Sequence, residues 1–544
     1  MEEQNDAVRR LGIVVAGSLT QGVDIKLDGG VSIEEMAVGR FVTIQGRHRR
    51  FFGVVTDISL ATTDDRLSAT PPDVADPFIA EVISGTSAYG CLHVTPYLTL
   101  DAEGMAGKGP LPAKTVPPHF ATARTSDPKE VQMIFGDNDG QHIWIGSPLD
   151  MEDAPVCLDV KRLVERSTGV FGKTGTGKSF LTRILLAELV QKSNVVSLIF
   201  DMHGEYGWEP PRGESGVAVK GLKQLFPSRV AVFTLDPESA LRRKISADFT
   251  VQIGFDEIEA EDVAALRGTL GLSEAMVGAA YRLAKKLGRR WVAEFLKGGS
   301  KEELAGLGGD IEFPGTVEAL RRRLAVLERF SFLKEKSPED SVKRLMEYLD
   351  RGMHVVLEFG AFQSNLSAYI LVANLLTRRI HARYVERMER AMGKTAEEPR
   401  PLVIAIEEAH KFLSPDVAGQ TTFGTIAREL RKYNVTLLVI DQRPSGIDGE
   451  IMSQLGTKIT CLLENDKDID AVLAGVSGSR ELRAVLAKLE TKQQALIFGH
   501  AVPMPVVVRT RTYDAEFYRS VGFKEPAQRR QELDRDLDDL FGKR

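Results

Sequence analysis

The chain has few of the residues that stabilise secreted or membrane proteins. Its 544 residues include only three cysteines, Cys91, Cys157 and Cys461, which lie far apart and form no metal-spaced cluster. A disulfide framework and a structural zinc site are therefore not expected, and a reducing, cytoplasmic location fits the composition. The longest apolar stretch, 369–376, is far shorter than the roughly 20 residues that a membrane-spanning helix needs, so we expect no membrane partner.

The sequence also lacks an excess of basic charge. It contains 70 Lys and Arg against 76 Asp and Glu, which gives a formal net charge of −6. Bulk charge therefore gives no sign of nucleic-acid binding, and any such surface has to be local, such as a basic groove or pore. With 43% hydrophobic residues over this length, the chain can bury large cores and is expected to form more than one folded unit.

One stretch, 172–179, carries a specific chemical signature. It reads Gly-Lys-Thr-Gly-Thr-Gly-Lys-Ser and fits the G-x-x-x-x-G-K-[ST] pattern of nucleotide phosphate-binding loops. We expect Lys178 to contact the β- and γ-phosphates of ATP and the Ser179 hydroxyl to bind Mg²⁺, while an apolar helix over 180–190 directs its N-terminus at the phosphates. The predicted nucleotide-binding residues are Gly172, Thr174, Gly175, Thr176, Gly177, Lys178, Ser179 and Phe180.

Later apolar runs end in acidic or polar residues. The run 401–406 is followed by Glu407 and Glu408, an arrangement that resembles a Walker B element. We expect Glu407 to hold Mg²⁺ and Glu408 to accept a proton from the attacking water. The next such run ends near Gln442, which is the candidate sensor of the γ-phosphate; the alternative is a strand-end residue that only bonds a neighbouring loop.

A third buried run, 195–200, ends in a polar segment that contains Asp201 and Glu205. Ligand sites of open α/β sheets lie at the carboxyl ends of the strands, so these two carboxylates are possible supporting residues.

The order of apolar patterns predicts an α/β fold with two additions. Closely spaced strand-like runs suggest a small N-terminal β-barrel, and strand character is expected again over 131–145. Helical periodicity between the phosphate loop and Glu407 suggests a helical insertion, whose basic clusters are either solvated helix faces or DNA contacts. The predicted units are a barrel in 1–150, an ATPase core in 151–254 and 351–520, an insertion in 255–350, and an amphipathic tail in 521–544.

Four stretches together resemble the HerA-type hexameric DNA translocases of the FtsK–HerA ATPase group: 172–179, 201–206, 406–410 and 426–444. The resemblance implies a RecA-like P-loop NTPase core and a homohexameric ring, with ATP between neighbouring subunits and double-stranded DNA in the lumen. It makes Glu408 the catalytic acid and Gln442 the sensor. It also implies an arginine finger inserted into the neighbour's site, for which Arg431 is the first candidate and Arg428 the second.

We therefore expect an ATP-driven translocase or helicase acting on double-stranded DNA. The family often works with a nuclease of the NurA type in DNA end processing, and some bacterial relatives pair with Sir2-like or nuclease effectors in phage defence. A conjugation or pilus ATPase is one alternative. The other is a nucleotide-controlled ring scaffold that organises an effector enzyme with little translocation. No second cluster of acids or histidines suggests a nuclease centre, so a partner protein is expected, with the barrel favoured as its docking site.

Overall fold

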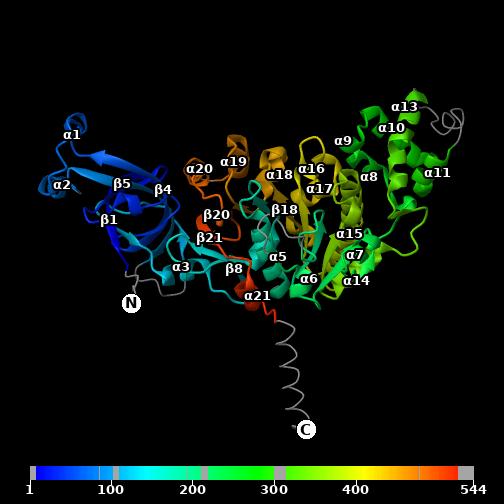
Figure 1. The fold of residues 1–544 in the computed structure, drawn as a ribbon, viewed down its shortest axis with the longest axis horizontal. Coiled ribbons are helices and arrows are strands. Elements are labelled where there is room, and N and C mark those ends of the chain that lie inside the picture. Colours follow the sequence, from blue (N-terminus) through cyan, green and yellow to red (C-terminus); the bar gives the residue numbers. More distant parts are fainter. Residues whose placement is uncertain are drawn as a thin grey trace, which may run out of the picture.

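Three parts of the chain follow one another along the long axis of the molecule (Figure 1). The computed structural model describes residues 8–84, 86–101, 109–192, 194–209, 219–298, 314–476 and 478–524, with the backbone alone at 314, 420 and 429–431. A barrel lies at one end, a large α/β sheet in the middle and a helical body at the other end. Most of the predicted tail, 525–544, lies outside the described residues.

The N-terminal part is a small β-barrel, as predicted, and the structure shows that six strands close it. Its strands run in the order β2-β1-β7-β3-β4-β5, and pairing of β2 with β5 closes the ring. Closure leaves no exposed sheet edge, and the inward side chains form a separate apolar core. The strands are β1 (Arg10–Ser18), β2 (Gly22–Leu27), β3 (Phe41–Gln45), β4 (Arg49–Thr62), β5 (Ala88–Asp101) and β7 (Thr122–Thr125); the short β6 (Leu111–Pro112) pairs with β5 outside the ring.

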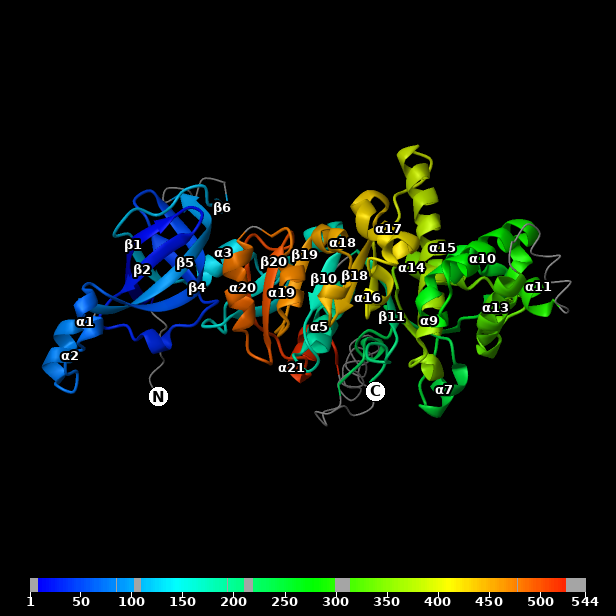
Figure 2. The same ribbon diagram turned by 90° about the horizontal axis from the view of Figure 1, so that it is seen from above.

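The ends of β4 and β5 that leave the barrel carry two short helices, α1 (Asp65–Ala69) and α2 (Pro77–Ile83). Neither helix contains a buried residue. Seen from above, both helices project beyond the barrel at the end of the molecule (Figure 2). We refer to residues 57–90 as the barrel projection.

The prediction of a strand over 131–145 is wrong for the first half of this range. Residues Pro128–Phe135 form helix α3, because Asp127 caps it, Pro128 occupies its first turn and Glu130 completes a capping box. The strand β8 (His142–Pro148) follows, and it pairs with β21 (Val506–Thr510) of the central sheet. This strand therefore belongs to the α/β part, although the sequence assigned it to the barrel in 1–150.

The central part is a twelve-stranded sheet in the order β13-β12-β16-β11-β17-β18-β10-β19-β20-β21-β8-β9. The first eight strands are parallel and the last four pair antiparallel. Leu198 packs in one apolar core and Ile199 in another, so both faces of the sheet are covered. The remaining bounds are β9 (Val156–Asp159), β10 (Thr168–Phe171), β11 (Val196–Asp201), β12 (Val230–Thr234), β13 (Phe249–Thr250), β16 (His354–Glu358), β17 (Leu402–Glu407), β18 (Val435–Asp441), β19 (Thr457–Thr460) and β20 (Gln494–Gly499).

Helices pack on both faces of this sheet (Figure 1), and none in the described ranges is long and apolar enough to cross a membrane. The longest is α15 (Leu366–Met392), and α5 (Lys178–Lys192) follows the phosphate loop. The others are α4 (Val160–Glu165), α6 (Leu222–Leu225), α7 (Pro237–Arg242), α14 (Ser341–Asp350), α16 (His410–Leu413), α17 (Thr422–Glu429), α18 (Gly449–Gln454), α19 (Asp466–Leu473), α20 (Ser479–Ala487) and α21 (Ala515–Ser520).

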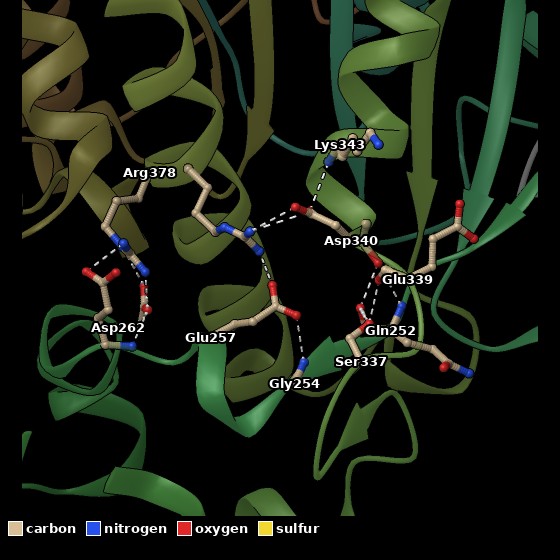
Figure 3. Close-up of polar contacts among 12 residues, drawn as sticks. Gln252, Gly254, Glu257, Asp262, Ser337, Glu339, Asp340, Lys343 and Arg378 are labelled. Atoms are coloured by element: carbon tan, nitrogen blue, oxygen red, sulfur yellow. Dashed lines mark hydrogen bonds and ion pairs between the residues drawn. The ribbon is translucent and has the colours of Figure 1, made fainter. Parts of the chain in front are cut away.

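The helical insertion is anchored to α15 by ion pairs, one of which includes a fully buried carboxylate (Figure 3). Arg378 donates to the fully buried Asp262 at 2.8 Å and pairs with Glu259 at 2.6 Å. The adjacent Arg379 bridges Glu257 and Asp340. The insertion comprises α8 (Ala260–Ala265), α9 (Arg267–Leu270), α10 (Glu274–Leu287), α11 (Trp291–Lys297) and α13 (Pro314–Leu324). The predicted fold class, an α/β P-loop core with an N-terminal barrel and a helical insertion, is confirmed.

Candidate nucleotide-binding and hydrolysis site

Four neighbouring strands of the sheet bring the predicted site residues to one edge. The strands β11, β17, β18 and β10 lie side by side and parallel. Their carboxyl ends carry Asp201, Glu407, Asp441 and the phosphate loop respectively. Segments that are up to 270 residues apart in the chain thus meet where open α/β sheets bind ligands.

The phosphate loop connects β10, which ends at Phe171, to α5, which begins at Lys178. Gly175 and Gly177 adopt φ values of +82° and +91°, a backbone region that only glycine enters without strain. The Thr176 hydroxyl donates to the carbonyl of Lys173 at 2.7 Å, which closes the loop on itself. The loop therefore leaves the N-terminus of α5, the positive end of the helix dipole, accessible to an anion such as a phosphate group.

Lys178 shares its surroundings with three carboxylates. Burial lowers the pKa of the Lys178 ammonium, while the negative charges of Asp441, Glu407 and Glu408 oppose this shift. Ser179 is half-buried in the first turn of α5, and Phe180 is 38% exposed with the Arg183 guanidinium over its ring. The charges of both predicted acids, Glu407 and Glu408, thus act on the lysine of the phosphate loop.

Glu407 is a buried carboxyl group with one oxygen free. The Tyr206 hydroxyl donates to its Oε1 at 2.9 Å, while its Oε2 has no hydrogen-bond partner. Burial, with the nearby charges of Asp201 and Glu205, raises the pKa of Glu407 to about 8. A buried oxygen without a donor is an available ligand for a hard cation.

Glu408 has a different environment from its neighbour. Its φ of +49° lies in the left-handed region, which residues other than glycine seldom adopt. The side chain of Glu408 therefore does not continue the alternating directions of the side chains along β17. Nε2 of Gln442 donates to Oε1 of Glu408 at 3.2 Å. Oε1 of Gln442 in turn accepts from the Thr174 hydroxyl of the phosphate loop. Gln442, the predicted sensor, therefore joins the predicted catalytic acid to the phosphate loop.

The two possible supporting carboxylates have different roles in this geometry. Asp201 is fully buried and accepts from the backbone N–H groups of Glu205, Tyr206 and Gly207 at 2.7, 2.8 and 3.1 Å. Its oxygens thus shape the turn after β11. Oε2 of Glu205 lies 3.9 Å from the guanidinium of Arg183. Both carboxylates act on Glu407 through their charge.

The two candidate finger arginines lie on the segment before β18. Arg428 lies in the last turn of α17 and pairs with Glu450 of its own chain, with 3.2 Å between Nε and Oε2. Arg431 lies in the short 3₁₀ helix Leu430–Tyr433. The side chain of Arg431 lies outside the described part of the chain, so its role stays a prediction.

Sequence reasoning assigned no role to four residues that the structure places around the two acids: Tyr206, Tyr369, His410 and Asp441. Tyr369, on α15, donates to the carbonyl of Glu407 and accepts from its N–H, at 3.0 and 3.2 Å. His410 and Asp441 are hydrogen-bonded to each other beside Glu408. Only Asp441 has a signal in the sequence that could have indicated a role in the site: it is a polar residue at the end of an apolar strand.

Comparisons with known proteins find related helicases. Residues 143–380 match the family model described as the central domain of helicase HerA. The chain is 28% identical over 406 residues to the DNA double-strand break repair helicase HerA of Pyrococcus furiosus, covering 70% of each chain. It is 25% identical over 534 residues to the protein of the same name from Sulfurisphaera tokodaii, covering 93% of this chain and 94% of that one.

Among solved structures, VirB4 of Thermoanaerobacter pseudethanolicus aligns with a TM-score of 0.42 and 14% identity, over 71% of this chain and 100% of that chain. The plasmid coupling protein TrwB in complex with a non-hydrolysable GTP analogue aligns with a TM-score of 0.46 and 14% identity, over 71% and 93%. The phosphate loop, the paired acids at the end of β17, the family model and the related helicases lead to one conclusion: the chain carries the central domain of HerA helicases over residues 143–380 and is similar to HerA-type P-loop ATPases over most of its length.

Proposed function

We propose that this protein binds ATP with Mg²⁺, hydrolyses it, and uses the energy to move along double-stranded DNA as a homohexameric ring. The observation that carries the proposal is the contact of Gln442 with both Glu408 and Thr174. Such a contact makes the position of the catalytic acid depend on what occupies the phosphate loop. The related proteins are named as DNA double-strand break repair helicases, and this supports DNA as the track.

In the proposed reaction Lys178 and the N-terminus of α5 bind the phosphates. Glu408 orients the attacking water and accepts its proton, and Gln442 contacts the γ-phosphate oxygens. Ser179 and the free Oε2 of Glu407 would hold Mg²⁺; when bound, Mg²⁺ neutralises charge on the phosphate oxygens. Arg431 of a neighbouring subunit would add positive charge at the transferring phosphoryl group.

The net charge of −6 means that DNA has to be held by local basic surfaces repeated around the ring. Such contacts go mostly to phosphates and depend little on base sequence. Affinity for duplex DNA should then fall steeply with salt, because each neutralised phosphate releases counterions.

We further propose that a nuclease or a Sir2-like effector works with this ring in DNA end processing or phage defence, and that it docks on the barrel projection. Leu60 and Phe78 in the projection are 81% and 72% exposed, and no described residue from 57 to 90 is buried. Six acidic residues and one arginine give this segment a net charge of −5. It therefore suits a protein with a basic, apolar surface and repels nucleic acid.

The test is the ATPase rate of the full-length protein with and without duplex DNA, with Lys178→Ala as the inactive control. A motor is expected to hydrolyse ATP faster on duplex DNA and to displace a bound protein from it. ATP hydrolysis that duplex DNA does not change, together with no displacement, would favour the nucleotide-controlled scaffold. The docking claim needs a separate arm, in which a chain with residues 63–87 replaced by a two-residue turn is tested for binding a purified candidate effector.

A further inference from the structure

We infer that His410 and Asp441 position the catalytic acid: Asp441 fixes the imidazole of His410, and the imidazole faces the carboxylate of Glu408. This inference rests on the proposed role of Glu408. It adds a positioning pair for which the sequence motifs carry no assignment, and it accounts for two polar side chains that the reaction as described above does not use.

Asp441 is built to hold the histidine. It is the last residue of β18 and is fully buried. Its Oδ2 accepts from the backbone N–H of His410 at 2.7 Å and lies 3.0 Å from Nδ1 of the same residue. Its Oδ1 accepts from the backbone N–H of Arg443 at 2.7 Å. Two backbone groups thus fix the carboxylate, and the carboxylate fixes the ring.

The charge state of Asp441 agrees with this arrangement. Burial alone would raise its pKa, but the hydrogen bonds and charge of His410, with the N–H of Arg443, hold the pKa of Asp441 below its ordinary value. An ionised carboxylate only accepts hydrogen bonds, so Nδ1 of His410 has to carry a proton toward it. The other ring nitrogen, Nε2, is then directed away from Asp441.

Nε2 of His410 lies 3.8 Å from Oε2 of Glu408. The other oxygen of the same carboxylate, Oε1, accepts from Gln442 at 3.2 Å. The end of β18 therefore controls both oxygens of Glu408, one directly through Gln442 and one through Asp441 and His410. Such two-point support fixes the direction of a carboxylate that has to meet a water molecule, and a misplacement of about 1 Å can cost roughly 100-fold in rate.

A purely structural role for His410 makes a different prediction. His410 begins α16, and its backbone N–H is bonded to Asp441 whatever the side chain is. The imidazole itself adds only the contacts with Asp441 and Glu408 among the hydrogen bonds and ion pairs described for it. Changes confined to the side chain therefore separate positioning of Glu408 from stability of the turn.

The experiment compares His410→Ala, His410→Asn and His410→Gln in the full-length protein. The Asn amide can place its nitrogen near Nδ1, and the longer Gln amide can place its nitrogen near Nε2. We expect His410→Ala to lower kcat about 10- to 100-fold with little change in KM or in the Kd for a fluorescent ATP analogue. His410→Gln should recover part of the lost kcat, and His410→Asn should recover less, since only Gln reaches toward Glu408.

Two outcomes would overturn the inference. One is a kcat for His410→Ala close to that of the wild type in a folded, nucleotide-binding protein. The other is an equal loss of kcat in the Asn and Gln variants accompanied by loss of nucleotide binding, which indicates a structural residue. Glu408→Gln, measured in parallel, separates this inference from the proposed function. If Glu408→Gln is inactive and His410→Ala is normal, only the positioning role fails. If Glu408→Gln hydrolyses ATP at the normal rate, Glu408 is not the catalytic acid, and the proposed function is contradicted together with the positioning role that rests on it.

Discussion

Nε2 of Gln442 lies 3.2 Å from Oε1 of Glu408, and this hydrogen bond connects the ends of two adjacent strands, β17 and β18. Gln442 also accepts from Thr174 in the phosphate loop. The glutamine is thus placed to transmit the occupancy of the loop to Glu408, the proposed catalytic acid.

Replacing Gln442 by alanine should leave nucleotide binding intact and lower turnover. The variant keeps Lys178 and the loop but loses the hydrogen bond that orients Glu408, and removal of one such preorganised contact typically costs about 10²- to 10³-fold in rate. Steady-state phosphate release and the Kd of an ATP analogue measure the two effects. Gln363→Ala, at an exposed turn before α15, is the matched control; equal rates in the two variants would remove Gln442 from the site.

Mixing inactive subunits should restore activity if catalysis is shared between neighbours. Arg431→Ala and Lys178→Ala proteins are each expected to be inactive, because one lacks the finger and the other lacks the phosphate contact. A mixture contains interfaces that pair an intact finger with an intact loop, so the ATPase rate should rise above that of either protein alone. Arg428→Ala is the comparison, since Arg428 already pairs with Glu450 in its own chain. Failure of freely exchanging subunits to complement would assign Arg431 another role.

Much of the site could be predicted from the sequence because its parts are contiguous. The loop 172–179 and the pair Glu407–Glu408 each combine a buried strand with the residue types that their chemistry requires. The parallel order of β11, β17, β18 and β10 then brings them to one edge. Repeating apolar patterns likewise predicted the barrel and the helical insertion.

Contacts between separate strand ends could not be predicted in this way. The pairs Gln442–Glu408 and His410–Asp441 depend on strand order and on the left-handed backbone of Glu408. Nothing in a hydrophobic pattern specifies either feature. The helix over Pro128–Phe135 was missed for a local reason, since its capping box and its proline outweigh the apolar residues that suggested a strand.

Removing Arg378 should destabilise the attachment of the helical insertion. Arg378→Met leaves the carboxylate of Asp262 fully buried without its cationic partner, and such a loss costs about 3 to 5 kcal/mol. The melting temperature is therefore expected to fall. The double variant Arg378→Met/Asp262→Asn removes the unpaired charge and should recover part of the loss. A double variant no more stable than Arg378→Met would show that the ion pair is not the source of the effect.

His354 should make the protein less stable in mild acid. Burial, with the charge of Arg229, lowers the pKa of His354 to about 4, and its Nδ1 lies 2.8 Å from the Ser197 hydroxyl. In the unfolded chain a histidine binds a proton below about pH 6.5, whereas the folded chain stays neutral at His354 down to about pH 4. Stability should therefore fall as the pH drops from about 6.5 to 4, by up to about 1.4 kcal/mol per pH unit.

The measurement for His354 is the melting temperature of the wild type and of His354→Gln between pH 7.5 and 4.5. The variant cannot titrate at this position, so the difference in melting temperature should narrow as the pH falls. A difference that stays constant across this range would mean that His354 is not the titrating group.

The most direct test of the central claim, ATP hydrolysis through Glu408, is a single-turnover experiment with Glu408→Gln. Excess protein is mixed with radiolabelled ATP and Mg²⁺, and the bound nucleotide is analysed over time. The account predicts that the variant binds ATP about as tightly as the wild type and retains it uncleaved, because the Gln amide cannot accept the proton of the attacking water. Formation of ADP at a rate close to that of the wild type would contradict it.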